Sequence, residues 1–308
     1  MNFSLLTRQK LQNMLLAIAA FLTGLLIKFF SLMPNQPLGA VAGWLGRKLG
    51  PLFPRNKVAI ENLRLAFPDK SDKWRREICR SMWENLFRNL TESIKISEFC
   101  DFDVATGKGE LLSVINAQHA LTLREDGKAG IIFTAHTGNW ELLPVAAAKF
   151  GLLVSSLYRP PSFTYFARLI KTHRARTMPN LVASRPGVAF ELATILDRCG
   201  HVGVLVDQKY TSRSRVRVSF FDHPADANPL VAKLARRFEC PVHGARVIRK
   251  PGGRHTLELT GPVELVRDES GEIDVEAATA QIAKIVESWV REHPDQWLWI
   301  HRRWKVDY

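Results

Sequence analysis

The stretch that decides the fold is AGIIFTAHTGNWELLPVAAAKFG, residues 129–151. Ala129 to Ala135 is an uninterrupted apolar run, rich in β-branched residues and short enough to be one buried strand. Leu142 to Phe150 has the composition of a helix, and Gly151 follows it as a helix stop signal. A polar turn joins the two. We therefore expect a strand, a turn and a helix in this order.

The turn contains a His-x-x-x-x-Glu pair, His136 and Glu141. Residues five apart on a continuous helix lie about 140° apart, so these side chains can face each other only if the chain turns at Gly138 and Asn139. The spacing alone carries little weight, since nine His and thirty acidic residues in 308 positions give about 0.9 such pairs by chance. The position of the pair at a strand-to-helix junction matters more, because open α/β sheets place their sites there.

Two further predicted strands also end at ionisable residues. Leu152 to Tyr158 is followed by Arg159, and His201 to Val206 is followed by Asp207. The carboxyl ends of parallel strands share one edge of a sheet, so residues far apart in the sequence can meet there. The expected fold class is α/β, with a mostly parallel central sheet flanked by helices.

The residues at this edge have the composition of an acid–base site. A neutral imidazole at His136 would act as a general base, and a carboxylate would orient the imidazole. Glu141 and Asp207 are both candidates for that orienting carboxylate, and the sequence does not rank them. Arg159 and Asn139 are candidates for holding a carbonyl or phosphate oxygen of a substrate.

Further candidate substrate-binding residues follow Asp207. Gln208 adjoins it, and Arg213, Arg215 and Arg217 alternate along SRSRVRVSFF, so on a strand all three would point to one face. Guanidinium groups match phosphate oxygens, which favours a phosphate-binding row. An exposed edge strand protected by charge explains the same pattern equally well.

The composition predicts an anionic partner. The formal net charge is +13 and the isoelectric point is about 9.9, which suits nucleic acid, anionic lipid headgroups or an acidic carrier protein. The four cysteines show no C-x-x-C spacing and no paired pattern, so we expect neither a zinc site nor disulfides, and a reducing, cytosol-facing domain. The local signatures of nucleotide hydrolases, serine hydrolases, zinc proteases and dinucleotide-binding proteins are missing from the sequence. We expect no metal and no cofactor.

The N-terminal region predicts attachment to a membrane. Residues 11–33 are apolar, carry one charge, at Lys28, and are long enough for a transmembrane helix or a deep membrane anchor. A cleaved signal peptide is the rival interpretation, but its best cleavage site, Ala17 to Ala19, lies inside the apolar run. The expected division is an anchor over residues 1–36 and a catalytic domain over residues 37–308, with a helical part over 37–100 and an α/β core over 129–308.

Two other segments pair apolar with basic side chains. A stripe with a four-residue period begins at Trp74 and ends at Ile94; we interpret it as core, with its interleaved basic residues free to lie on anionic lipid. The final HPDQWLWIHRRWK, residues 293–305, predicts an interface that is apolar at one level and anionic at the next.

Six blocks, in this order, resemble one known family. They are KVAIENLRLAFPDKS, HTGNWE, SLYRPP, VGVLVDQK, SFFDHPADANPLVAKLARR and HPDQWLWIHRRWK. In these blocks the chain resembles the bacterial lipid A biosynthesis lauroyl/myristoyl (late) acyltransferases, within the wider group of glycerolipid acyltransferases that carry a His-x-x-x-x-Asp/Glu motif. The resemblance implies that His136 and Glu141 are the catalytic motif and that Arg159 and Asp207 belong to the site. The wider group usually has Asp where this chain has Glu141.

The resemblance also implies a reaction. The expected function is transfer of a lauroyl- or myristoyl-like chain from acyl carrier protein to a hydroxyl of a phosphorylated lipid A precursor, in lipopolysaccharide biosynthesis at the cytoplasmic face of the bacterial inner membrane. An acyl-CoA-dependent acyltransferase of another glycolipid, such as a phosphatidylinositol mannoside, is the alternative enzyme. A membrane-anchored nucleic-acid-binding protein is the alternative outside enzymes. Because the basic residues are scattered and no recognition motif is visible, we expect no nucleic acid partner.

Overall fold

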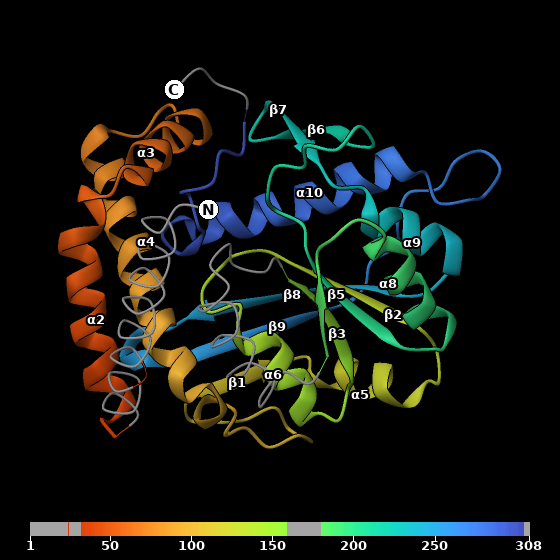
Figure 1. The fold of residues 1–308 in the computed structure, drawn as a ribbon, viewed down its shortest axis with the longest axis horizontal. Coiled ribbons are helices and arrows are strands. Elements are labelled where there is room, and N and C mark those ends of the chain that lie inside the picture. The colour runs from red at the N-terminus through yellow and green to blue at the C-terminus, as the bar shows by residue number, and fades with distance from the viewer. Residues whose placement is uncertain (1–23, 25–31, 159–179, 305–308) are drawn as a thin grey trace, which may run out of the picture.

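The computed structural model describes residue 24, residues 32–158 and residues 180–304 (Figure 1). Apart from Gly24, Leu32 and Met33, the expected membrane segment at 11–33 lies outside the described residues, as does Arg159. Across the described ranges, no helix combines the length and the apolar composition that crossing a bilayer requires.

The core of the molecule is a seven-stranded sheet in the order β1-β9-β8-β2-β5-β3-β4. The five strands from β8 to β4 are parallel to one another, β9 is antiparallel to β8, and β1 is parallel to β9. The expected mostly parallel sheet is confirmed. The strands are β1 (Leu112–Ile115), β2 (Gly130–Thr134), β3 (Val154–Tyr158), β4 (Leu181–Ala183), β5 (His201–Leu205), β8 (Val242–Arg249) and β9 (His255–Pro262).

The central strand β2 explains why its sequence is apolar without interruption. Ile131 and Phe133 point to one side of the sheet, are 0% exposed, and belong to the cluster that includes helix α10 (Val275–Glu292). Ile132 points to the other side and packs on the cluster that includes α5 (Ala117–Glu125) and α6 (Leu142–Lys149). A parallel strand covered on both faces must be apolar at every position.

Helices therefore form a layer on each face of the sheet. Helix α10 and its neighbour α9 (Leu230–Phe238) lie on the opposite side from α5 and α6 (Figure 1). Helix α8 (Val188–Asp197) contacts β5 and α9. Helix α9 begins directly after Asn228-Pro229, and α10 ends two residues before Pro294.

A two-stranded hairpin, β6 (Val216–Phe220) and β7 (His223–Ala227), forms a separate small sheet that packs on α10. The predicted strand with three aligned arginines is wrong, because Arg213 lies in a turn and Arg215 precedes the first strand residue. The turn is closed by Ser212, whose carbonyl accepts the backbone N–H of Arg215 at 3.2 Å. Arg215 and Arg217 both lie beside Asp226, at 3.4 and 3.6 Å.

The helical N-terminal part covers one end of the sheet. It contains α2 (Asn35–Leu49), α3 (Arg55–Ala66) and α4 (Asp72–Glu92), with short 3-10 helices at Gly50–Leu52 and Ser93–Phe99. Ser71 caps α4 by accepting the backbone N–H of Trp74 at 3.2 Å. Most of the predicted apolar stripe packs into the core, as at Met82, which is 2% exposed, whereas Leu90 is 62% exposed.

The predicted interfacial role of the C-terminal tail is wrong. Trp297, Trp299 and Trp304 are 2% exposed or less and pack against the main core. The basic Arg303 is also buried, because its guanidinium lies over the ring of Phe220 and donates to the carbonyl of Asp226. Large aromatic rings stabilise the fold most when they are removed from water. The interior also supplies partners for the charge of Arg303, the ring of Phe220 and the carbonyl of Asp226.

Candidate active site

His136 lies two residues beyond the end of β2, and Asp207 lies two residues beyond the end of the neighbouring strand β5. The backbone N–H of His136 donates to Oδ2 of Asp207 at 3.0 Å. The Nδ1 atom of the same histidine lies 2.9 Å from Oδ1. Two residues 71 positions apart thus meet at the carboxyl edge of the sheet, as their places after the strands predict.

The Asp207 carboxylate is buried but fully engaged. It is 4% exposed, and the indole N–H of Trp297 donates to its Oδ2 at 2.7 Å. Burial alone would raise the pKa of Asp207, but the charge and hydrogen bonds of His136, together with the Trp297 indole, lower it to about 2. The carboxylate is therefore ionised at neutral pH. It accepts the Nδ1 proton of His136, which leaves the lone pair of the imidazole on Nε2.

Gln208 lies at that second nitrogen. Its amide nitrogen is 3.2 Å from Nε2 of His136 and 3.0 Å from Nε2 of His301. An amide nitrogen carries two hydrogens, so Gln208 donates to both imidazoles. The ring of Trp140 meets the His136 ring edge-on, with 5.0 Å between centroids. A hydroxyl that reaches Nε2 from the cavity must take the place of the Gln208 amide.

Glu141 directly precedes α6 but makes no side-chain capping hydrogen bond to it; its Oε1 accepts the indole N–H of Trp140 at 3.2 Å. Its side chain lines the same cavity as His136. The carboxylate of Asp207 is hydrogen-bonded to Nδ1 of the His136 ring.

A cavity of about 550 Å³ opens at this group. Its polar end holds His136, Glu141, Gln208 and His301. From there it extends between the sheet and helices α5 and α6, where its walls are apolar, among them Val114, Leu123, Ala146, Phe150, Leu257 and Leu259. The volume of the cavity is in the range of small-molecule sites. The placing of polar side chains at one end and apolar side chains along the rest suits a ligand with a long apolar part and a reactive polar end.

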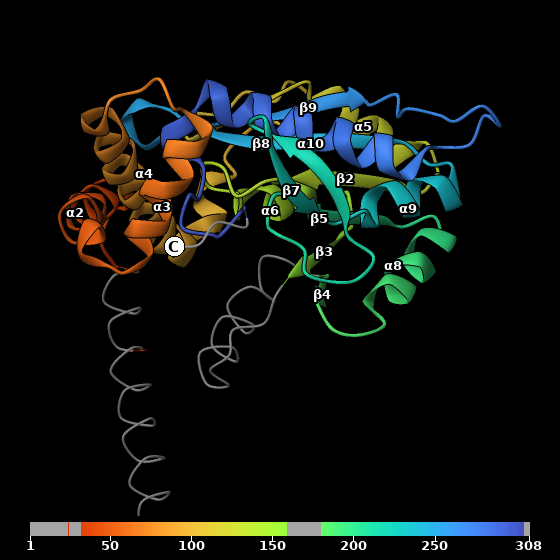
Figure 2. The same ribbon diagram turned by 90° about the horizontal axis from the view of Figure 1, so that it is seen from above.

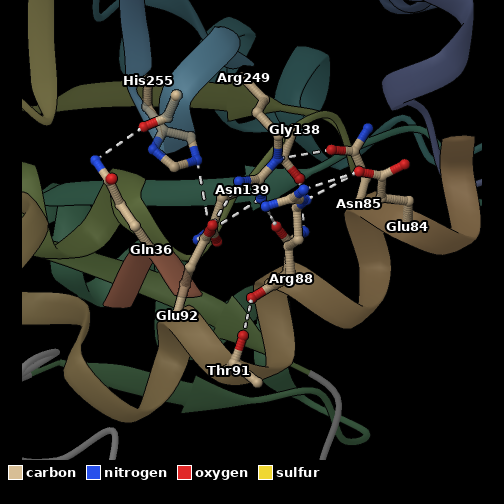
Figure 3. Close-up of polar contacts among 12 residues, drawn as sticks. Gln36, Glu84, Asn85, Arg88, Thr91, Glu92, Gly138, Asn139, Arg249 and His255 are labelled. Carbon is tan, nitrogen blue, oxygen red and sulfur yellow. Dashed lines mark hydrogen bonds and ion pairs between the residues drawn. The ribbon is translucent and has the colours of Figure 1, made fainter. Parts of the chain in front are cut away.

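The turn after His136 is held from its other side (Figure 3). Gly138 has φ +52°, and a Cβ atom there would lie 2.2 Å from the carbonyl oxygen of Val247, so only glycine fits. Its N–H donates to the carbonyl of Gln296 at 3.0 Å, and its carbonyl accepts from the Asn89 amide at 2.6 Å. The amide of the next residue, Asn139, donates to Glu92 at 2.8 Å.

Glu92 and Arg249 form a buried ion pair beneath this turn. An Nη2–Oε2 distance of 2.9 Å joins them, and Arg249 also donates to Asn85 and Asn89 of α4 (Figure 3). Burial acts to raise the pKa of Glu92, but the nearby His255 imidazole and the Arg249 guanidinium lower it to about 2. Burial lowers the pKa of His255, whose Nε2 is 3.4 Å from Glu92.

Several predicted site residues lie elsewhere. Asn139 is 0% exposed and bonded to Glu92, so its predicted contact with a substrate oxygen is replaced by support of the turn. Arg213, Arg215 and Arg217 do not line the cavity. Arg159 is outside the described residues, although its neighbour Tyr158 lines the cavity.

Sequence reasoning missed four residues of the site and its support: Trp297, His301, Glu92 and Arg249. The sequence carries one signal for Trp297 and His301, the final block HPDQWLWIHRRWK, whose mixture of aromatic and basic residues predicts a surface interface instead. Glu92 and Arg249 lie at the ends of a helix and a strand, and no motif joins them.

The model of the bacterial lipid A biosynthesis acyltransferase family matches residues 7–306 of this chain. The lipid A biosynthesis lauroyltransferase of Escherichia coli (strain K12) is 24% identical over 259 residues, which cover 82% of this chain and 79% of the relative. The family match covers nearly the whole sequence and includes every element that forms the cavity. The chain therefore belongs to the bacterial lipid A biosynthesis acyltransferases and is an acyltransferase of lipid A biosynthesis.

Proposed function

We propose that this enzyme transfers a fatty acyl chain from the thioester of acyl carrier protein to a hydroxyl of a phosphorylated lipid A precursor. The observation that supports this most is the His136–Asp207 pair at the polar end of an apolar cavity of about 550 Å³. The cavity accommodates the hydrocarbon chain between the sheet and helices α5 and α6. The thioester carbonyl then lies at the polar end, beside the imidazole.

The reaction follows from this placement. The acceptor hydroxyl replaces the Gln208 amide at Nε2 of His136 and gives its proton to that nitrogen as its oxygen attacks the thioester carbonyl. The tetrahedral intermediate collapses with cleavage of the C–S bond, and the departing thiolate takes the proton from the imidazolium. Asp207 stabilises the imidazolium between the two steps. Glu141 holds the acceptor at the polar end, and Arg159 stabilises the negative oxygen of the intermediate.

The partners follow from charge and sequence. A net charge of +13 suits both an acidic carrier protein and a phosphorylated glycolipid. The apolar residues 11–33 anchor the enzyme in the bacterial inner membrane, with the catalytic domain on the cytoplasmic side.

Replacing His136 with alanine tests the proposal. With purified full-length protein in detergent, lauroyl carrier protein and a radiolabelled lipid A precursor, we expect His136→Ala to lower kcat by roughly 10²- to 10⁴-fold, the usual contribution of a general base. His293→Ala is the matched control, since His293 lies at the end of α10 and does not line the cavity. Turnover of His136→Ala close to wild type would overturn the assignment. Competition by lauroyl-CoA in the same assay distinguishes the donors.

A further inference from the structure

A surface helix of a soluble protein packs its large apolar side chains against the core. Helix α2 has the reverse arrangement, with small residues on its packed side and large apolar residues on its outer side. The side that packs on α4 is made of small residues, Gly39, Ala42, Gly43 and Gly46, together with Leu38. The outer side carries large apolar residues: Val41 is 57% exposed, Trp44 58%, Leu45 37% and Leu49 45%. The apolar surface continues into the next turn, where Leu52 is 78% exposed and Phe53 45%.

The glycines are required for the packing of α2 on α4. A Cβ atom at Gly46 would lie 2.5 Å from the carbonyl oxygen of Trp83, and one at Gly50 would lie 2.1 Å from the Trp83 ring. The two helices therefore approach as closely as backbones allow. Helix pairs in lipid pack in this way, with small residues between the helices and large apolar residues facing outward. In water an outward face of this kind is unfavourable.

The charges of this region suit an anionic surface. The first 60 residues contain seven basic residues and no acidic residue, the first acid being Glu61. Lys48, Arg55 and Lys57 are exposed beside the apolar face, whereas Arg47 is engaged with Glu77 and Glu84 of α4. An apolar face bordered by lysine and arginine binds at the boundary between headgroups and acyl chains of anionic lipid.

The position of the helix in the chain points to the same partner. Helix α2 begins at Asn35, directly after the apolar residues 11–33 that we assign to the membrane. It lies at the periphery of the molecule, with α4 between it and the sheet (Figure 1 and Figure 2).

We propose that the outer face of α2, with Leu52 and Phe53, lies in the interfacial layer of an anionic phospholipid bilayer. This contact is separate from the N-terminal anchor and does not depend on the acyl transfer reaction. It has a consequence for the site. Helix α4 contacts α2 on one side, and through Asn89 and Glu92 it holds the turn at Gly138 and Asn139 on the other. The membrane contact thereby fixes the height of the catalytic turn above the bilayer.

Fluorescence at a single labelled position tests the contact. Val41→Cys is labelled with an environment-sensitive dye in full-length protein in which the exposed Cys199 is replaced by serine, and the protein is reconstituted into phosphatidylglycerol/phosphatidylethanolamine vesicles. Leu153→Cys is the matched control, because Leu153 is an equally exposed apolar residue, at 62%, on the α/β core. We expect a blue shift and quenching by nitroxide-labelled lipids at position 41, and quenching only by aqueous iodide at position 153.

Other occupants of the face give different results. Equal access of iodide to positions 41 and 153 would mean that the face lies in water. Shielding of position 41 from iodide without quenching by lipid nitroxides would mean that a second copy or residues 11–33 cover it. Either result overturns the proposal, and neither depends on catalysis.

A double substitution gives a functional readout. Val41→Glu/Leu45→Glu should keep the wild-type transfer rate in detergent but lose at least about tenfold with acceptor embedded in anionic vesicles, because carboxylates are repelled by the headgroups. Equal losses in both media would indicate a folding defect; the fluorescence measurement on the protein labelled at position 41 does not depend on this double substitution.

Discussion

Two buried carboxylates, Asp207 and Glu92, lie on opposite sides of the turn after His136, and they have much in common. Each is 4% exposed, each has a histidine as neighbour, and the pKa of each is lowered to about 2. The Asp207 oxygen is 2.9 Å from His136, and the Glu92 oxygen is 3.4 Å from His255. By composition alone, both are candidates for a catalytic pair.

Their histidines differ in access and in charge balance. The His136 side chain is 14% exposed and lines the cavity, whereas that of His255 is 0% exposed. Glu92 is bonded directly to Arg249, a permanent cation. The groups hydrogen-bonded to Asp207 are His136 and the neutral Trp297 indole, and Arg303 interacts with Asp207 through its charge alone. A histidine–carboxylate pair can act as a general base when the second ring nitrogen of the histidine is reachable from a cavity. When the histidine is fully buried and an arginine neutralises the carboxylate, the pair holds the backbone in place instead.

The largest effect we expect is on activity, at Asp207. Asp207→Asn should lower kcat by roughly 10²- to 10⁴-fold, because the amide neither enforces the Nδ1–H tautomer nor stabilises the imidazolium. The lost negative charge should also move the acidic limb of the pH–rate profile to lower pH. Transfer rates between pH 5 and 9 measure both effects. Asp222→Asn, with an 88% exposed side chain, is the control, and a profile unchanged in position would count against the role of Asp207.

The next effect is on stability, at Glu92. Glu92→Gln leaves Arg249 buried without a counter-ion, which should cost about 3–5 kcal/mol of the free energy of unfolding. Thermal unfolding in detergent, followed by near-ultraviolet circular dichroism, measures it. The protein that remains folded at low temperature should keep the wild-type pH–rate profile, because Glu92 does not contact His136.

A second variant separates loss of charge balance from loss of packing. Glu92→Gln/Arg249→Met removes both charges and should recover part of the stability lost in Glu92→Gln alone. If the two substitutions are simply additive, the pair does not act as a unit, and the comparison with Asp207 no longer holds.

The sequence predicted the edge of the sheet better than it predicted the roles of residues on that edge. His136 and Asp207 follow runs such as IIFTA and VGVLV, whose unbroken apolar character identifies strands buried on both faces. Their meeting then follows from parallel topology. Asn139 and Glu92 show the limit: side chains in a turn point either to the cavity or to the interior, and local sequence does not say which.

The predictions for the C-terminal tail and for the row of Arg213, Arg215 and Arg217 are wrong for a related reason. Alternation of basic and apolar residues has the same appearance whether the basic groups face water or find a buried partner, as Arg303 does at the carbonyl of Asp226. Likewise, alternation at Arg213 and Arg215 requires a strand, and the serines around them form a turn instead.

The smallest effect that we expect is on the stability of the fold at acid pH, to which the Asp207 carboxylate contributes. Because the pKa of Asp207 is lowered to about 2 in the folded protein and is about 3.9 in an unfolded chain, its ionised form stabilises the fold above pH 4. That contribution, about 2 kcal/mol, is lost as the pH falls through the folded pKa. Wild type should therefore lose stability more steeply than Asp207→Asn between pH 5 and 2. If the urea midpoints of wild type and Asp207→Asn fall in parallel across that window, the ionised carboxylate is no more stable in the folded chain than in the unfolded chain. Its geometry would then serve only the orientation of His136.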